Sequence, residues 1–151
     1  MLSLIHLFKY KNYDYLAGFL SSLIIKHLSE IGFNPNKYKL ITSVPLHKDK
    51  LKIRGYNQSG LLSKLLSNHF KIPFKDDIIE NTNIRPSQTK LPREKREKNT
   101  EGIFVVKENL ENKSIILVDD IFTTGSTVSA CAKALKEKCA GNVTVITLSK
   151  T

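Results

Sequence analysis

The chain has 151 residues, 40% of them apolar and 25% charged, which is enough for one globular domain that buries roughly two-thirds of its unfolded surface. The longest nearly apolar run, residues 15–25, is too short to cross a bilayer, and the N-terminus lacks the basic, apolar and small-residue series of a signal peptide. We therefore expect a single cytoplasmic domain over residues 1–151, without a membrane span.

The formal net charge is +10, and most of the excess lies in two short segments. Residues 46–56 carry four basic and one acidic side chain (+3), and residues 85–100 carry six basic and two acidic ones (+4). Such a focused positive field favours an anionic partner, for example phosphate, pyrophosphate or nucleic acid. The alternative is a solvated basic surface in a lysine-rich protein.

Apolar spacing predicts the first elements in chain order. An amphipathic helix is predicted over 12–31 as the N-terminal element, and Gly32 with Pro35 ends it. Its apolar positions are Leu16, Phe19, Leu20, Leu23, Ile24, Leu28 and Ile31. A short buried strand over 39–45 follows, then a helix over 55–70 and a weak strand over 76–82. Residues 84–100 are polar and contain two prolines, so we expect a loop or hairpin there.

The C-terminal third predicts strands over 102–106 and 114–120, a helix over 126–139 and a last strand over 142–149. Helices that alternate with short aliphatic strands indicate an α/β fold, in which helices cover both faces of a parallel sheet. Cys131 and Cys139 are predicted to lie on one face of the helix over 126–139, and both are expected to be buried.

Two adjacent carboxylates stand at the end of the predicted strand in the segment IILVDDIFTTGST, residues 115–127. Asp119 and Asp120 lie at the carboxyl end of that strand, where ligands collect in an open parallel sheet. Gly125 lets main-chain N–H groups at the start of the next helix approach an anion. Four hydroxyls add donors: Thr123, Thr124, Ser126 and Thr127. The combination suits a sugar phosphate, whose vicinal hydroxyls donate to carboxylates.

A helix cap or a P-loop nucleotide site would each account for less of this segment. A helix cap needs one Asp, Ser or Thr, whereas two acids and four hydroxyls surround the glycine here. A P-loop nucleotide site would need the motif GxxxxGK[ST], which the sequence lacks, and a lysine in the loop. A sugar phosphate therefore remains the preferred ligand.

The segment IILVDDIFTTGST resembles the signature that binds phosphoribosyl pyrophosphate (PRPP) in type I phosphoribosyltransferases. Three further segments resemble, in order and spacing, the ComF family of competence-associated proteins: LIHLFKYKNYDYLAGFL, SVPLHKDKLKIRGYNQSGLL and RPSQTKLPREKREKNTEGIF. The resemblance covers nearly the whole chain and implies a type I phosphoribosyltransferase fold with a flexible hood loop. The four-cysteine zinc ribbon that usually precedes LIHLFKY in this family is not in the sequence, so we expect folding without zinc.

The resemblance also implies roles for individual residues. Asp119 and Asp120 match the pair that contacts the ribose hydroxyls. The loop around the 5-phosphate is matched by Thr123, Thr124, Gly125, Ser126 and Thr127. The pyrophosphate loop, often strained by a non-proline cis peptide, is matched by Pro45, Leu46, His47 and Lys48. Residues 84–100 match the hood, in which Arg93 and Arg96 would close over the pyrophosphate.

The implied chemistry is transfer of the phosphoribosyl group, with magnesium arriving chelated by PRPP rather than held by protein ligands. Breaking the C1 bond needs the charge on the leaving pyrophosphate to be neutralised, which magnesium and basic groups do without a covalent nucleophile. We expect His47 to contact phosphate or solvent rather than to act as an acid or base. No segment identifies the acceptor.

Two functions stay open at this level. One is an enzyme that transfers the phosphoribosyl group from PRPP during DNA uptake in natural transformation. The other is a non-catalytic competence protein that handles single-stranded DNA and retains the fold and the PRPP site. Only Tyr56 and Phe104 accompany the basic segments, so stacking on bases is weakly indicated. A second copy of the chain, in a homodimer, is a further expected partner.

Overall fold

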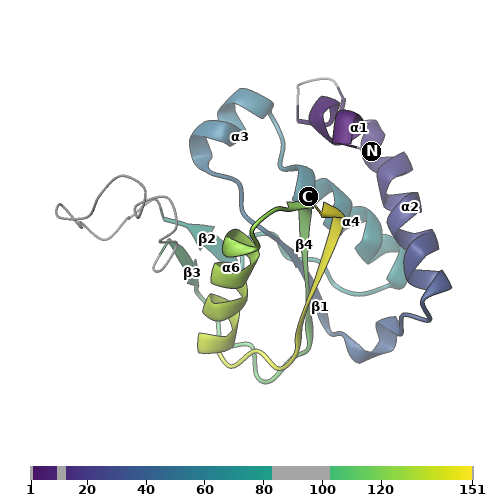
Figure 1. The fold of residues 1–151 in the computed structure, drawn as a ribbon. Coiled ribbons are helices and arrows are strands. Elements are labelled where there is room, and N and C mark those ends of the chain that lie inside the picture. Colours follow the sequence, from purple (N-terminus) through teal and green to yellow (C-terminus); the bar gives the residue numbers. More distant parts are fainter. Residues whose placement is uncertain (1, 10–12, 83–102, 151) are drawn as a thin grey trace.

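A three-stranded parallel sheet lies at the centre of the computed structural model, which describes residues 2–9, 13–82 and 103–150. Its strands, in the order β1-β4-β5, are β1 (Leu40–Ser43), β4 (Ile115–Phe122) and β5 (Val143–Lys150) (Figure 1). Residues 115–118 of β4 are completely buried, because helices cover both faces of this central strand. The predicted parallel sheet is thereby confirmed.

Helices cover the two faces of the sheet unequally. On one face lie α2 (Leu16–Glu30) and α4 (Gln58–Phe70), and on the other lies α6 (Ser126–Glu137) (Figure 1). Ile116 and Val118 pack in the cluster that contains α2 and α4, whereas Ile115 and Leu117 pack in the cluster that contains α6. This alternation follows from the pleat of β4.

Two of the predicted strands do not join this sheet. β2 (Ile79–Asn81) and β3 (Phe104–Val106) form a separate antiparallel pair beside α6. The prediction of one parallel sheet is wrong for them, since an antiparallel pair needs no crossover helix between its strands. They flank residues 83–102, so the predicted hood lies outside the described residues.

The N-terminal region differs from the prediction in two ways. The helix α1 (Leu2–Leu7) comes first, so the predicted helix over 12–31 is not the N-terminal element, and α2 begins only at Leu16. The buried stripe of α2 is narrow, with Leu20 and Ile24 at its centre. Phe19 is 54% exposed and Ile31 61% exposed, because both fall outside that stripe.

The helix α3 (Lys48–Arg54) was not predicted, because none of its residues is buried and it has no apolar periodicity. It ends at Gly55, whose φ of 84° is left-handed. A short 3₁₀ turn, η1 (Pro35–Lys37), precedes β1. No helix in the described part of the chain is long and apolar enough to cross a bilayer.

The two cysteines have different environments. Cys131 is buried in α6, as predicted, and burial raises the pKa of its thiol. Cys139 is exposed, so the expectation that both are buried is wrong. The reason is that α6 ends at Glu137 and Cys139 takes a φ of 60°, which removes it from the buried helix face.

Candidate functional site

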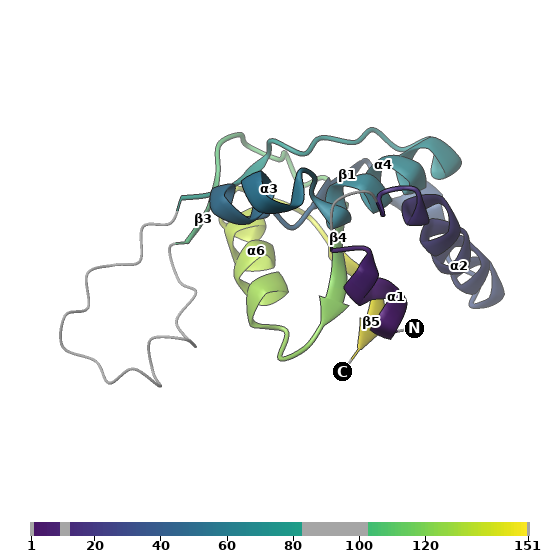
Figure 2. The ribbon, with the colours of Figure 1, turned by 90° about the horizontal axis from the view of Figure 1, so that it is seen from above.

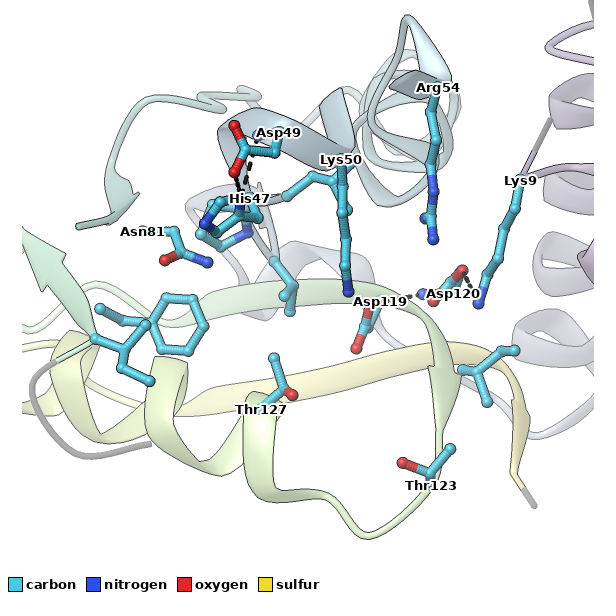
Figure 3. Close-up of a pocket in the computed structure, with 16 residues that line it drawn as sticks. Lys9, His47, Asp49, Lys50, Arg54, Asn81, Asp119, Asp120, Thr123 and Thr127 are labelled. Carbon is cyan, nitrogen blue, oxygen red and sulfur yellow. Dashed lines mark hydrogen bonds and ion pairs between the residues drawn. The ribbon is translucent and has the colours of Figure 1, made fainter. Parts of the chain in front are cut away.

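A cleft of about 810 Å³ opens at the carboxyl edge of the sheet. In Figure 1, α1 and α3 stand above this edge, and Figure 2 shows α1 beside the end of β5 and α3 on the side of α6. Four parts of the chain line the cleft: the segment after α1, the loop after β1 together with α3, the β2–β3 pair, and the end of β4 with its loop into α6. Its polar and charged lining residues are Lys9, His47, Asp49, Lys50, Arg54, Asn81, Asp119, Asp120, Thr123 and Thr127 (Figure 3).

The acidic pair lies at the centre of this lining, as the sequence predicts. The Ser59 hydroxyl and the main-chain N–H of Asp120 both donate to Oδ1 of Asp119, at 3.1 and 2.9 Å. Asp120 Oδ2 lies 3.1 Å from Nζ of Lys9. Burial, together with the neighbouring Asp120 carboxylate, raises the pKa of Asp119 to about 6. The pair can therefore accept hydrogen bonds from a diol once both groups are ionised.

The predicted 5-phosphate loop connects β4 to α6. Gly125 has a φ of 77° and occupies the N-cap of α6, so the N–H groups of the first turn face the loop. The Thr124 and Ser126 hydroxyls lie 3.0 Å apart and bond to each other. Thr123 and Thr127 are exposed, and both line the main cleft. The loop thus borders the same cavity as the acidic pair.

The predicted pyrophosphate loop, residues 45–48, forms the opposite wall. Leu46 and His47 line the cleft, whereas Lys48 is exposed and does not. Nδ1 of His47 accepts the main-chain N–H of Asp49 at 3.0 Å and so caps α3. That bond requires an unprotonated Nδ1, which argues against an ion pair with the Asp49 carboxylate 3.4 Å away. Every peptide bond among the described residues is trans, so the cis peptide of the resemblance is absent from this loop.

Lys48 was predicted to contact the pyrophosphate, but other cations line the cleft. Lys50 and Arg54 are one helical turn apart on α3, and both side chains point into the cleft (Figure 3). Lys9 reaches the same cleft from the N-terminal segment. Sequence reasoning missed Lys9, although it lies within the LIHLFKY segment that carries the resemblance. The hood residues Arg93 and Arg96 lie outside the described residues.

The segment RGYNQS, residues 54–59, makes hydrogen bonds to both the loop after β1 and the acidic pair. Asn57 Nδ2 donates to the Val44 carbonyl at 3.1 Å, which holds the start of the pyrophosphate loop. Two residues later, the Ser59 hydroxyl reaches Asp119. The beginning of α4 therefore fixes the spacing between the loop after β1 and the acidic pair after β4.

The side chains of the cleft can be compared with the ligands that a magnesium ion needs. Among the described residues, no group of three or more His, Cys, Asp or Glu side chains could hold a metal. The cleft offers three carboxylates, and that of Asp120 is already paired with Lys9. Magnesium commonly binds through one or two carboxylates plus substrate phosphates. The cleft therefore offers as many carboxylates as magnesium usually takes from a protein when phosphates supply its other ligands.

Comparison with known proteins gives the family and the fold. Residues 57–150 match the phosphoribosyl transferase domain family. The chain is 30% identical over 98% of its length to "DNA utilization protein YhgH" of Shigella flexneri, and it spans 66% of that protein. It is 35% identical over 69% of its length to "Competence protein ComFC" of Bacillus subtilis, of which the match covers 41%. The purine phosphoribosyltransferase structure from Pyrococcus horikoshii superposes with a TM-score of 0.54 at 17% identity, over 93% of this chain and 76% of that one, and so supports the fold alone.

Proposed function

Because the chain belongs to the ComF-type phosphoribosyltransferase family, we propose that its cleft binds PRPP with magnesium and transfers the phosphoribosyl group to an acceptor. The observation that carries this proposal is that one cavity contains an acidic pair between a wall with Lys50 and Arg54 and a wall with the Thr123 and Thr127 hydroxyls. A diol between two phosphate groups, which is the layout of PRPP, matches that order.

Each part of PRPP has a counterpart in the cleft. The ribose hydroxyls donate to the carboxylates of Asp119 and Asp120. The 5-phosphate lies at the start of α6, where main-chain N–H groups and the Thr127 hydroxyl are available. The pyrophosphate lies below the loop after β1, within reach of Lys50 and Arg54.

Neutralising charge on the leaving pyrophosphate is the main catalytic requirement, since no covalent nucleophile is needed. Bound magnesium supplies part of that neutralisation. Lys50 and Arg54 supply the rest from α3, and Asn57 holds the start of the loop that leads into α3. His47 stays a helix cap and takes no part in proton transfer.

Binding of PRPP with magnesium should stabilise the folded chain. A ligand at about 100 times its dissociation constant adds roughly 2.7 kcal/mol, which for a chain of this size raises the melting temperature by about 5–11 °C. Calorimetry should give saturable binding, weaker for pyrophosphate or ribose 5-phosphate alone, since each fills only half of the cleft. The same titrations with candidate acceptors would then identify the second substrate. Absence of any shift at millimolar PRPP and magnesium would rule the proposal out.

A second candidate function is the handling of single-stranded DNA in competence; the names of the two relatives refer to DNA utilization and to competence. The supporting observation is the distribution of charge on α3. Lys50 and Arg54 line the cleft, whereas Lys48 and Lys52, also one turn apart, are exposed and lie outside its lining. The outward pair is thus available to a phosphate backbone while the inward pair serves PRPP.

The two functions can be separated by replacing the outward pair. Binding of an oligothymidylate should weaken with salt, with a log–log slope near −0.7 per phosphate neutralised. Lys48→Ala with Lys52→Ala should flatten that slope by about one unit or more. The same variant should bind PRPP as the wild type does. Salt-independent binding, or no binding at low salt, would leave the second function without support.

A further inference from the structure

Lys9 brings a positive charge to the acidic pair from a segment remote in sequence. Its Nζ lies 3.1 Å from Oδ2 of Asp120, and the two side chains are only 26% and 15% exposed. Figure 3 shows Lys9 reaching the pair from the side opposite the loop after β1. Residues 57–150, which match the phosphoribosyl transferase domain family, do not include Lys9. The N-terminal segment therefore adds a cation that the matched region does not contain.

The residue before Lys9 is held firmly. Phe8 is completely buried, and its carbonyl accepts two side-chain hydrogen bonds, from the Tyr56 hydroxyl at 2.8 Å and from Nε2 of Gln58 at 3.2 Å. Gln58 is itself buried, and its Oε1 accepts from Nη1 of Arg54 at 3.1 Å. We call the two bonds to the Phe8 carbonyl the clamp. Because of the clamp, Lys9 is not an ordinary mobile surface lysine.

Building on the proposed function, we propose that Lys9 is a positioning residue of the PRPP site, which orients the Asp120 carboxylate for the ribose diol and places a positive charge beside the acidic pair, and that the clamp sets Lys9 in place. Two adjacent carboxylates in a half-buried site disfavour each other's ionised form. A protonated carboxyl loses acceptor capacity for a ligand hydroxyl. A cation at hydrogen-bond distance offsets that repulsion and keeps both groups available as acceptors.

Other titratable and charged groups lie around the acidic pair. Those that face it from the surrounding elements are Lys50 and Arg54 on α3, His47 and Asp49 at the start of α3, and Cys131 on α6. All of them remain unchanged when Lys9 alone is replaced. The difference in pH dependence between the wild type and a Lys9 variant therefore isolates the contribution of Lys9.

The test is calorimetric titration of the full chain with PRPP and magnesium between pH 6 and pH 8.5. Lys9→Met should weaken binding about tenfold at pH 7, the loss expected when one charge-assisted contact is removed. The loss should be larger at pH 6, where an acidic pair without its cation takes up a proton, and smaller at pH 8.5. A purely structural role would give the same loss at every pH.

The matched control is Lys75→Met. Lys75 also pairs with a carboxylate, at 2.9 Å from Oε1 of Glu108, but it is exposed and does not line the cleft. This variant removes the same charge and one ion pair, and it should bind PRPP within about twofold of the wild type. If Lys9→Met binds like the wild type, or loses affinity equally at all pH values, Lys9 does not act through Asp120. If the wild type itself does not bind PRPP, the proposed function is wrong, and the role of Lys9 is wrong with it.

A double-mutant cycle tests the clamp. Tyr56→Phe removes the hydroxyl that donates to the Phe8 carbonyl and that also bonds to the Gln58 side chain, and it should weaken PRPP binding about threefold. In the Lys9→Met background the same change should have no further effect, since the clamp acts on the site through Lys9. Additive losses would show that Tyr56 supports the site independently of Lys9 and would overturn the clamp. Melting temperatures of the three variants should stay close together, which separates binding from unfolding.

Discussion

Replacing both carboxylates of the acidic pair, Asp119→Asn with Asp120→Asn, should abolish PRPP binding while leaving the protein folded. In the proposed complex each carboxylate would accept a charge-assisted hydrogen bond from one ribose hydroxyl, worth about 1.5–3 kcal/mol. Loss of both should weaken binding by two orders of magnitude or more, since 1.4 kcal/mol corresponds to a tenfold change. Calorimetry and the thermal shift with PRPP and magnesium measure this directly. Undiminished binding would place the ribose elsewhere.

The thermal stability of the unliganded double variant shows whether the protein remains folded. The pKa of Asp119 is raised from 3.8 to about 6 in the folded chain, so this carboxyl favours folding below about pH 4. That contribution is lost as the pH rises through 6, and at pH 7.5 ionised Asp119 costs at most about 3 kcal/mol. The unliganded double variant should therefore melt no lower than the wild type at pH 7.5. Any advantage it has should disappear near pH 4.

A second adjacent pair of aspartates supplies the matched control. Asp76 and Asp77 are both exposed and lie outside the cleft lining. Asp76→Asn with Asp77→Asn makes the same change in charge and composition. PRPP affinity should stay at the wild-type value, so a comparable loss would point to net charge rather than to contacts with the ribose.

The central part of the site was predictable because its signals are local. Asp119 and Asp120 follow directly from the buried strand, and the structure places both in the cleft with Thr123 and Thr127. Helices cover both faces of β4, so its buried residues form a continuous aliphatic run rather than an alternating pattern. A single continuous segment thus contains the strand, the acidic pair and the start of the next helix.

The remaining part of the site depends on contacts that local patterns do not encode. Lys9 reaches Asp120 only after the N-terminal segment has been anchored by Tyr56 and Gln58, and no spacing rule connects these positions. The helix α3 has no apolar periodicity because none of its residues is buried, so the inward direction of Lys50 and Arg54 could not be deduced. Likewise, strand propensity alone gave no partner for β2, which pairs antiparallel with β3.

Gly125→Ala should give one of the larger losses of stability that a single methyl group can produce in this chain. Gly125 has a φ of 77°, which a residue with a Cβ adopts at a cost. A Cβ at this position would lie 2.5 Å from Cζ of Phe122, so the ring would have to move. Phe122 is half-buried and packs against the cluster beneath α6, with Nζ of Lys150 6.0 Å from its ring centre, and moving it disturbs both contacts.

The expected cost of Gly125→Ala is about 2 kcal/mol, or a fall of roughly 4–8 °C in melting temperature, because backbone strain and overpacking add. PRPP binding should weaken as well, since the loop at the start of α6 shifts. Gly18→Ala is the control. Gly18 lies inside α2, and no heavy atom lies within 4 Å of the position that a Cβ would take. The same methyl group should therefore stabilise the folded chain by about 0.5–1 kcal/mol. Adding Phe122→Leu to Gly125→Ala should restore the stability lost through the displaced Phe122 ring, but not the stability lost through the left-handed backbone at residue 125. Equal melting temperatures for the two alanine variants would mean that neither the left-handed backbone nor the Phe122 ring constrains the loop.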